Sequence, residues 1–224
     1  MTSLANKILH QIHGTSIYEN FDYQSYTSDL SGGETLPIFE KLINQLKPRI
    51  IIEVGSWKGR TATHMASLLK KQNRDAAIIC VDTWLGGIEH FTNLKNHKAW
   101  GINKYKKHGY PNLYYQFLSN VMRTGMQDYI VPLPTTSNIG AQWLKLNKVK
   151  ADLIFIDASH EEEDVYQDLS NYWDLLKDGG VIFGDDWHSQ WYGVICAVNR
   201  FAKDKNLSPR LKKDIWLFQK SRKK

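Results

Sequence analysis

"IIIEVGSWKGRTATHMA", residues 50–66, contains a strand-like run, a glycine turn and the start of a helical pattern. The apolar run has the length of a strand and ends around Glu53, and apolar residues recur at helical spacing from Ala62 to Leu69. Gly55 and Gly59 lie between them, and glycine lets a backbone pass close to a ligand. The stretch therefore predicts a strand–turn–helix unit of an α/β fold.

The rest of the chain continues this alternation. Uninterrupted apolar strands that alternate with amphipathic helices are typical of a mostly parallel sheet with helices on both faces. The patterns predict strands at 50–54, 76–82, 129–134, 151–157, 179–185 and 214–220, and helices at 4–12, 34–47, 62–69, 114–125, 139–146, 162–176 and 193–204.

We divide the chain into an N-terminal arm at 1–33 and one domain at 34–224. The segment at about 83–113 is too long for a simple connection and is predicted to be a lid-like insertion. The segment contains the aromatic and histidine residues Trp84, His90, His97, Trp100 and Tyr105.

The composition is typical of a globular protein, with 42% hydrophobic and 23% charged residues among 224. Much of the formal net charge of +6 comes from the tail that begins at Arg210, and such a charge is a weak argument for a nucleic-acid partner. Cys80 and Cys196 lie in apolar patterns typical of core residues. Neither a signal peptide nor a bilayer-spanning run is recognisable, so we expect a cytoplasmic protein without a membrane partner.

Acidic residues follow several of the predicted strands. Asp82 ends the second strand, where a carboxylate can accept both hydroxyls of a ribose. The glycine patterns of dinucleotide folds and phosphate loops are missing, which favours a nucleoside cofactor without phosphates. Asp157, Asp185 and Asp186 should share the same edge, and such carboxylates suit Mg²⁺ or another divalent cation; helix capping and solvation are the alternatives.

His160 lies three residues after Asp157 in the sequence, in the turn above the same edge. A histidine there could take a proton from a substrate hydroxyl, or have no chemical role. The acidic run 161–164 behind it is predicted to open a helix and to interact with the helix dipole.

These motifs, "IIEVGSWKGRTA", "CVDTWLGG", "VPLPTTS", "IFIDASHEEEDVYQDLSNYW" and "LLKDGGVIFGDDW", resemble class I S-adenosylmethionine-dependent methyltransferases. They are similar to the branch that contains macrolide-sugar and aminocoumarin-sugar O-methyltransferases. The resemblance implies a Rossmann-like sheet of seven strands with the last strand antiparallel. It implies S-adenosylmethionine as cofactor, a divalent metal at Asp157, Asp185 and Asp186, and His160 as general base. The cofactor-binding residues would be Glu53, Gly55, Ser56, Trp57, Gly59, Thr61, Asp82 and Ser137.

Within this resemblance, Trp57 and Thr61 would lie near the carboxylate of the cofactor, Asp82 at its ribose and Ser137 at its adenine. The acceptor would be a small-molecule hydroxyl, with a sugar as one candidate. The aromatic and histidine side chains of the insertion could then stack on a sugar ring or pack on the core. The short arm leaves open whether a neighbouring subunit of a homo-oligomer completes the lid. A nucleic-acid methyltransferase, a non-catalytic cofactor-binding module and a nicotinamide dehydrogenase are the rival hypotheses.

Overall fold

The computed structural model describes residues 3–33, 35–91 and 101–222. A seven-stranded sheet has the order β5-β2-β1-β6-β7-β9-β8. Neighbours from β5 to β7 are parallel, whereas β9 is antiparallel to both β7 and β8, which confirms the predicted topology. The strands are β1 (Ile50–Val54), β2 (Ala77–Asp82), β5 (Ile130–Pro134), β6 (Ala151–Ile156), β7 (Leu176–Gly184), β8 (Arg210–Lys212) and β9 (Ile215–Gln219).

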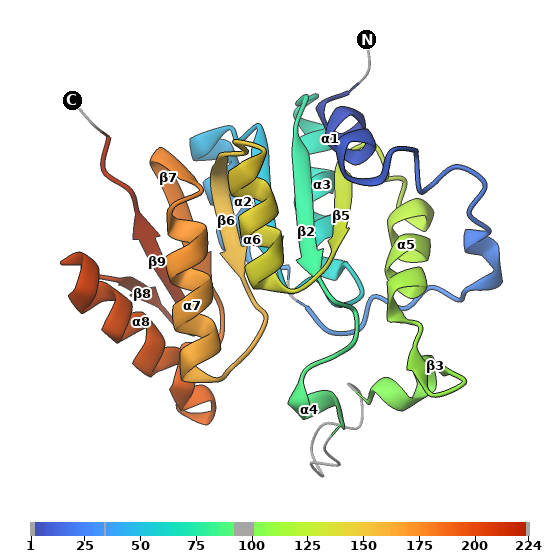
Figure 1. The fold of residues 1–224 in the computed structure, drawn as a ribbon. Coiled ribbons are helices and arrows are strands. Elements are labelled where there is room, and N and C mark those ends of the chain that lie inside the picture. Colours follow the sequence, from blue (N-terminus) through green and yellow to red (C-terminus); the bar gives the residue numbers. More distant parts are fainter. Residues whose placement is uncertain (1–2, 34, 92–100, 223–224) are drawn as a thin grey trace.

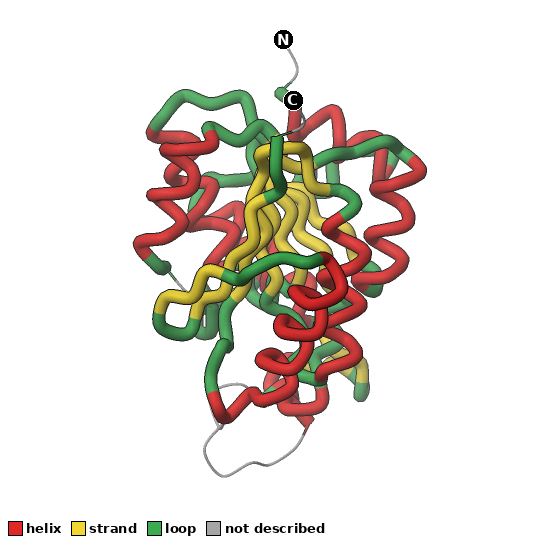
Figure 2. The backbone as a smooth tube through the Cα atoms, turned by 90° about the vertical axis from the view of Figure 1, so that its left-hand side faces the viewer, coloured by secondary structure: helices red, strands yellow, loops and turns green. Residues whose placement is uncertain are grey.

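Helices cover both faces of this sheet. In Figure 1, α6 and α7 lie in front of the strands and α2 and α3 behind them, and Figure 2 shows the strands between two helical layers. The helices are α1 (Leu4–His13), α2 (Pro37–Leu46), α3 (Arg60–Lys71), α5 (Leu113–Arg123), α6 (Ser137–Leu146), α7 (Glu162–Trp173) and α8 (Tyr192–Lys205).

Apolar strand residues form the core, as their continuous runs predict. Phe39 of α2 packs edge-on against Phe155 of β6 and Phe183 of β7, at ring-centroid distances of 5.1 and 5.6 Å. Cys80 is fully buried and Cys196 partly buried, and both are free thiols. The apolar packing contacts of the core stabilise the fold mainly by burying apolar surface, which contributes about 25 cal/mol per Å².

Two helix boundaries differ from the prediction by three residues, and the first is that α2 begins at Pro37 and not at residue 34. The pattern predicted a helix to residue 176, whereas α7 ends at Trp173. Leu176 instead pairs with Ala151 and begins β7. Sheet pairing therefore takes precedence over the apolar spacing at this position.

The insertion lies beside the carboxyl ends of the parallel strands, where Figure 1 shows α4 and β3. It contains α4 (Ile88–Phe91), the short helix η3 (Ile102–Tyr105) and a small hairpin of β3 (Lys106–Lys107) and β4 (Tyr110–Pro111). Trp84 is buried against Tyr114 and Phe117, so this side chain packs on the core. His97 and Trp100 lie outside the described residues, and the division into arm, domain and insertion stays a prediction.

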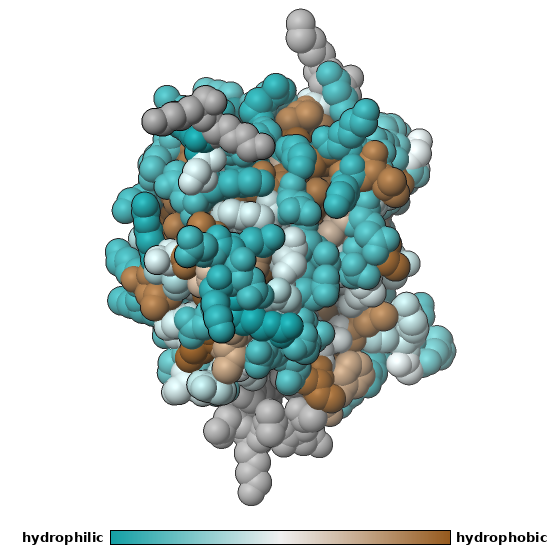
Figure 3. All heavy atoms as spheres, turned by 60° about the vertical axis from the view of Figure 1, so that its left-hand side comes forward, coloured by the Kyte–Doolittle hydropathy of each residue, from teal (hydrophilic) through white to brown (hydrophobic). Residues whose placement is uncertain are grey.

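The surface is mainly polar on the face drawn in Figure 3, where hydrophobic atoms are scattered in small groups. Apolar side chains scattered singly are normal on protein surfaces. Over the described ranges, no helix combines the length and the apolar character that crossing a membrane requires.

Candidate cofactor and active site

Three neighbouring parallel strands bring the predicted site residues to one edge of the sheet. Val54 of β1 pairs with Ile156 of β6, and Ile156 pairs with Gly184 of β7. The next residues along these strands are Gly55, Asp157 and Asp185. The glycine turn and two of the predicted carboxylates therefore start from adjacent strand ends.

Both glycines of the turn are required by close approach. Gly55 has a φ of +85°, and a Cβ there would lie 2.1 Å from the carbonyl oxygen of Asp157. Gly59 has a φ of +82°, and its Cβ would lie 2.9 Å from the Phe117 ring. Since L-residues with side chains avoid this region of φ, both positions require glycine for the packing of the protein itself.

Asp82 anchors the turn from the end of β2. Its Oδ2 accepts hydrogen bonds from the backbone N–H groups of Ser56 (2.9 Å) and Trp57 (2.8 Å), and its Oδ1 accepts one from the N–H of Trp84 (2.7 Å). Burial raises the pKa of Asp82, although these backbone hydrogen bonds act in the opposite direction. The carboxylate expected at a ribose thus also fixes the backbone of the turn.

Glu53 is a fully buried acid beneath the same turn. Its Oε2 accepts from the Ser56 hydroxyl (2.5 Å) and from the Cys80 thiol (3.5 Å), whereas no partner of Oε1 is found within the described chain. Burial raises the pKa of Glu53 to about 7. A buried oxygen without a partner fits a ligand that donates N–H groups or carries positive charge, and S-adenosylmethionine does both.

Contacts with Asp186 and Trp191 position His160 at this edge. Its Nε2 lies 3.0 Å from Asp186 Oδ2, and its ring stacks on Trp191 with a centroid distance of 3.8 Å. A Cβ on Gly193 would lie 2.3 Å from the His160 carbonyl oxygen, so the start of α8 packs directly on this loop. The structure therefore brings the predicted base and one predicted metal ligand together.

The predicted metal ligands are only partly assembled. Asp186 has a left-handed backbone with φ +65°, its N–H donates to Asp185 Oδ1 (2.9 Å), and its carboxylate contacts His160. Among the residues that the structure describes, no group of three or more His, Cys, Asp or Glu side chains is arranged to hold a metal ion. The carboxylates of Asp157, Asp185 and Asp186 thus do not form a ready ligand set in this structure.

Ser137 is the first residue of α6, and Thr61 is the second residue of α3. The Ser137 hydroxyl donates to Asp168 Oδ1 (2.5 Å), and the Tyr172 hydroxyl donates to the Ser137 carbonyl (2.9 Å). Burial raises the pKa of Asp168 to about 7. Sequence reasoning missed Asp168, although an acid at helical spacing from the apolar Val165 and Tyr172 could have indicated it.

The acidic run behind His160 opens α7, as predicted. Glu162, Glu163 and Asp164 lie in the first turn of the helix, where negative charge complements the helix dipole. Glu163 also forms a surface ion pair with Arg200 at 2.5 Å.

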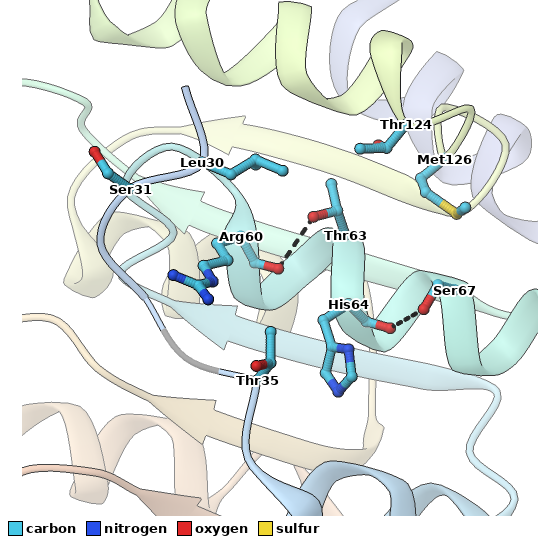
Figure 4. Close-up of a pocket in the computed structure, with 9 residues that line it drawn as sticks. All are labelled: Leu30, Ser31, Thr35, Arg60, Thr63, His64, Ser67, Thr124 and Met126. Atoms are coloured by element: carbon cyan, nitrogen blue, oxygen red, sulfur yellow. Dashed lines mark hydrogen bonds between the residues drawn. The ribbon is translucent and has the colours of Figure 1, made fainter. Parts of the chain in front are cut away.

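A separate cavity of about 480 Å³ lies beside α3. Figure 4 shows Arg60, Thr63 and His64 of this helix facing residues of the arm and of the segment after α5. The hydroxyl of Thr63 donates back to carbonyl groups of its own helix region. None of the predicted site residues lines this cavity.

Solved O-methyltransferases have a similar fold. NovP is 16% identical, with 88% of this chain and 84% of that chain covered and a TM-score of 0.62. CalS11, a TDP-rhamnose 3'-O-methyltransferase of calicheamicin biosynthesis, is 16% identical, with 81% and 77% covered and a TM-score of 0.57. An O-methyltransferase from Bacillus cereus in complex with SAH is 15% identical, with 96% and 91% covered and a TM-score of 0.57.

No curated protein matches the sequence. A family described as "Methyltransferase domain" matches residues 52–187, which is more than half of the chain. This match includes the glycine turn, Asp82, His160 and the paired aspartates. The chain therefore belongs to this methyltransferase domain family and has the fold of class I S-adenosylmethionine-dependent methyltransferases.

Proposed function

We propose that this protein is an S-adenosylmethionine-dependent O-methyltransferase that acts on a hydroxyl group of a small molecule. The observation that carries the proposal is the His160–Asp186 pair beside the glycine turn, at the same sheet edge. A sugar hydroxyl is the acceptor class that we would test first, since the similar CalS11 methylates TDP-rhamnose.

The residues of the turn would hold the cofactor. Backbone groups at Gly55 and Gly59 would line its methionine end, and Glu53 would offer its unpaired oxygen to that end. The remaining contacts would come from Ser56, Trp57, Thr61, Asp82 and Ser137. When bound, S-adenosylmethionine supplies a methyl group attached to a positively charged sulfur.

His160 would act as the general base. In the tautomer that donates from Nε2 to Asp186, the basic lone pair is on Nδ1. Asp186 fixes the orientation of the ring and stabilises the positive charge that forms when the imidazole takes the hydroxyl proton. General base catalysis of this kind typically contributes about 10²–10⁴ in rate.

A divalent cation such as Mg²⁺ stays a prediction of this account. Asp157, Asp185 and Asp186 carry the oxygen ligands that such a cation prefers. The acid–base role of His160 does not depend on this prediction.

Methyl transfer to a panel of sugars and diols tests the proposal, with His160→Gln and the matched control His188→Gln. His188 is an exposed histidine of the same edge. We expect His160→Gln to lower kcat by about 10²-fold or more with little change in cofactor affinity, and His188→Gln to retain activity. Equal activity of both variants would contradict the role of His160, and transfer to RNA alone would overturn the small-molecule acceptor.

A further inference from the structure

Lys58 is a buried cation in the glycine turn. Its side chain is completely inaccessible to solvent, although lysines in turns are normally solvated. Its Nζ donates to Asp29 Oδ1 (2.9 Å), to Tyr105 Oη (3.1 Å) and to Ser31 Oγ. All three donors of the ammonium group therefore have acceptors. The arm supplies two of these acceptors, and η3 of the insertion supplies the third.

Further hydrogen bonds of Asp29 and Asn120 extend the polar contacts around Lys58. Asp29 Oδ2 accepts hydrogen bonds from Tyr105 Oη and from Lys104 Nζ (3.2 Å). Asn120 of α5 is fully buried, and its Nδ2 donates to the carbonyl oxygens of Asp29 (2.7 Å) and Lys58 (2.8 Å). We call Asp29, Lys58, Tyr105 and Asn120 the Lys58 junction. It joins the arm, the turn, the insertion and α5.

The charges of the junction depend on one another. Burial lowers the pKa of Lys58, whereas the hydrogen bond from Lys58 to Asp29 opposes this change. Burial alone would raise the pKa of Asp29, yet hydrogen bonds from Ser31, Tyr105 and Lys58 hold it well below its usual range. Removing one partner of a buried ion pair leaves an uncompensated charge, which is worse than removing both.

Trp57, the neighbour of Lys58, also contacts both the arm and the insertion. Its indole stacks on His90 of α4 with a centroid distance of 4.1 Å. From the arm, a Cβ on Gly32 would lie 2.9 Å from the Trp57 ring, and a Cβ on Gly33 would lie 3.0 Å from Thr61 Oγ1. Figure 1 shows the arm (blue) passing around α5 before it reaches α2. Arm and insertion therefore meet on residues predicted to bind the cofactor.

We propose that Lys58 is a positioning residue that fastens the arm at 27–33 and the insertion segment at 102–105 to the cofactor turn. Held in this way, the two segments form the wall that covers the carboxylate end of the cofactor. The identity of the ligand in this inference rests on the proposed function. The role of Lys58 in holding the two segments is a property of the ligand-free protein. It identifies Asp29 and Lys58 as a pair on which cofactor affinity depends.

Amide hydrogen exchange and calorimetric titration with S-adenosylhomocysteine test the inference in Lys58→Met, Asp29→Asn and the double variant. Lys177→Met is the matched control, because Lys177 pairs with Asp152 at 2.8 Å at the opposite edge of the sheet. In each single variant we expect exchange at 27–33 and at 101–107 to rise together by about tenfold or more, while β6 stays protected. We expect the Kd to rise by about tenfold or more, with partial recovery in the double variant. The control should change neither quantity.

Three results would overturn the inference: loosening of only one segment, loosening of both with an unchanged Kd, or equal effects in Lys177→Met. If Lys58→Met does not fold, Asp29→Asn decides, because this change removes one charge with almost no change in volume. Absence of binding in the wild type would refute the cofactor instead, and the exchange data would still decide whether Lys58 fastens the two segments.

Discussion

Asp82 combines two tasks in one carboxylate, since it caps three backbone N–H groups at the position expected to face a ribose. Asp82→Asn replaces one acceptor oxygen by a donor. We expect the free energy of unfolding to fall by roughly 1–3 kcal/mol, because a backbone N–H loses its partner. We also expect the Kd for S-adenosylhomocysteine to rise by about tenfold or more.

Asp152→Asn is the matched control for this prediction. Asp152 accepts the backbone N–H groups of Arg49 (2.9 Å) and Ile50 (3.0 Å) at the opposite edge of the sheet. Chemical denaturation should therefore reveal a comparable loss of stability, and calorimetry an unchanged Kd. The same loss of affinity in both variants would mean that Asp82 acts through global stability only.

Glu53 makes the stability of the ligand-free protein depend on pH. Burial raises its pKa in the folded protein to about 7. At a pH below its ordinary pKa, the acid is protonated in both the folded and the unfolded protein, and it does not lower stability. As the pH rises through 5 to 7, ionisation favours the unfolded state and stability is lost. At pH 8, Glu53→Gln should therefore unfold at a higher urea concentration than the wild type. The free energy of unfolding should be larger in the variant by an amount on the order of 2–3 kcal/mol, and this difference should vanish near pH 5. A difference that is independent of pH would refute this account.

At the scale of elements, the turn after β1 depends on backbone contact with the loop after β6. Gly55 and Gly109 have similar φ values of +85° and +83°, but a Cβ at Gly109 meets nothing within 4 Å. We expect Gly109→Ala to cost about 1–2 kcal/mol from backbone strain alone. Gly55→Ala should cost more than about 3 kcal/mol or prevent folding, because its Cβ overlaps a backbone oxygen. Thermal unfolding of the two variants measures this difference. Equal losses of stability in both variants would contradict the expectation.

The elements and the sheet edge could be predicted because they leave strong local patterns. The apolar runs of β1, β2 and β6 have no competing interpretation, and parallel strands necessarily place the residues after them at one edge. β8 was missed because its three residues are exposed and polar apart from Leu211. The buried state of Lys58 could not be predicted, because its partner Asp29 lies 29 residues away in an arm without periodicity.

At the scale of the whole molecule, the fold gathers negative charge at one sheet edge of a chain with net positive charge. Close carboxylates repel one another unless a cation or a proton joins them. If the metal prediction is right, EDTA should abolish methyl transfer, Mg²⁺ should restore it, and Asp185→Ala should prevent the restoration. Full activity in EDTA would contradict the metal prediction.

The central claim is that this edge binds S-adenosylmethionine. Titration calorimetry of the wild-type protein with S-adenosylmethionine, in Mg²⁺ and then in EDTA, tests it most directly. We predict saturable binding of one cofactor per chain in the micromolar range. Absence of binding by the folded protein under both conditions would contradict it.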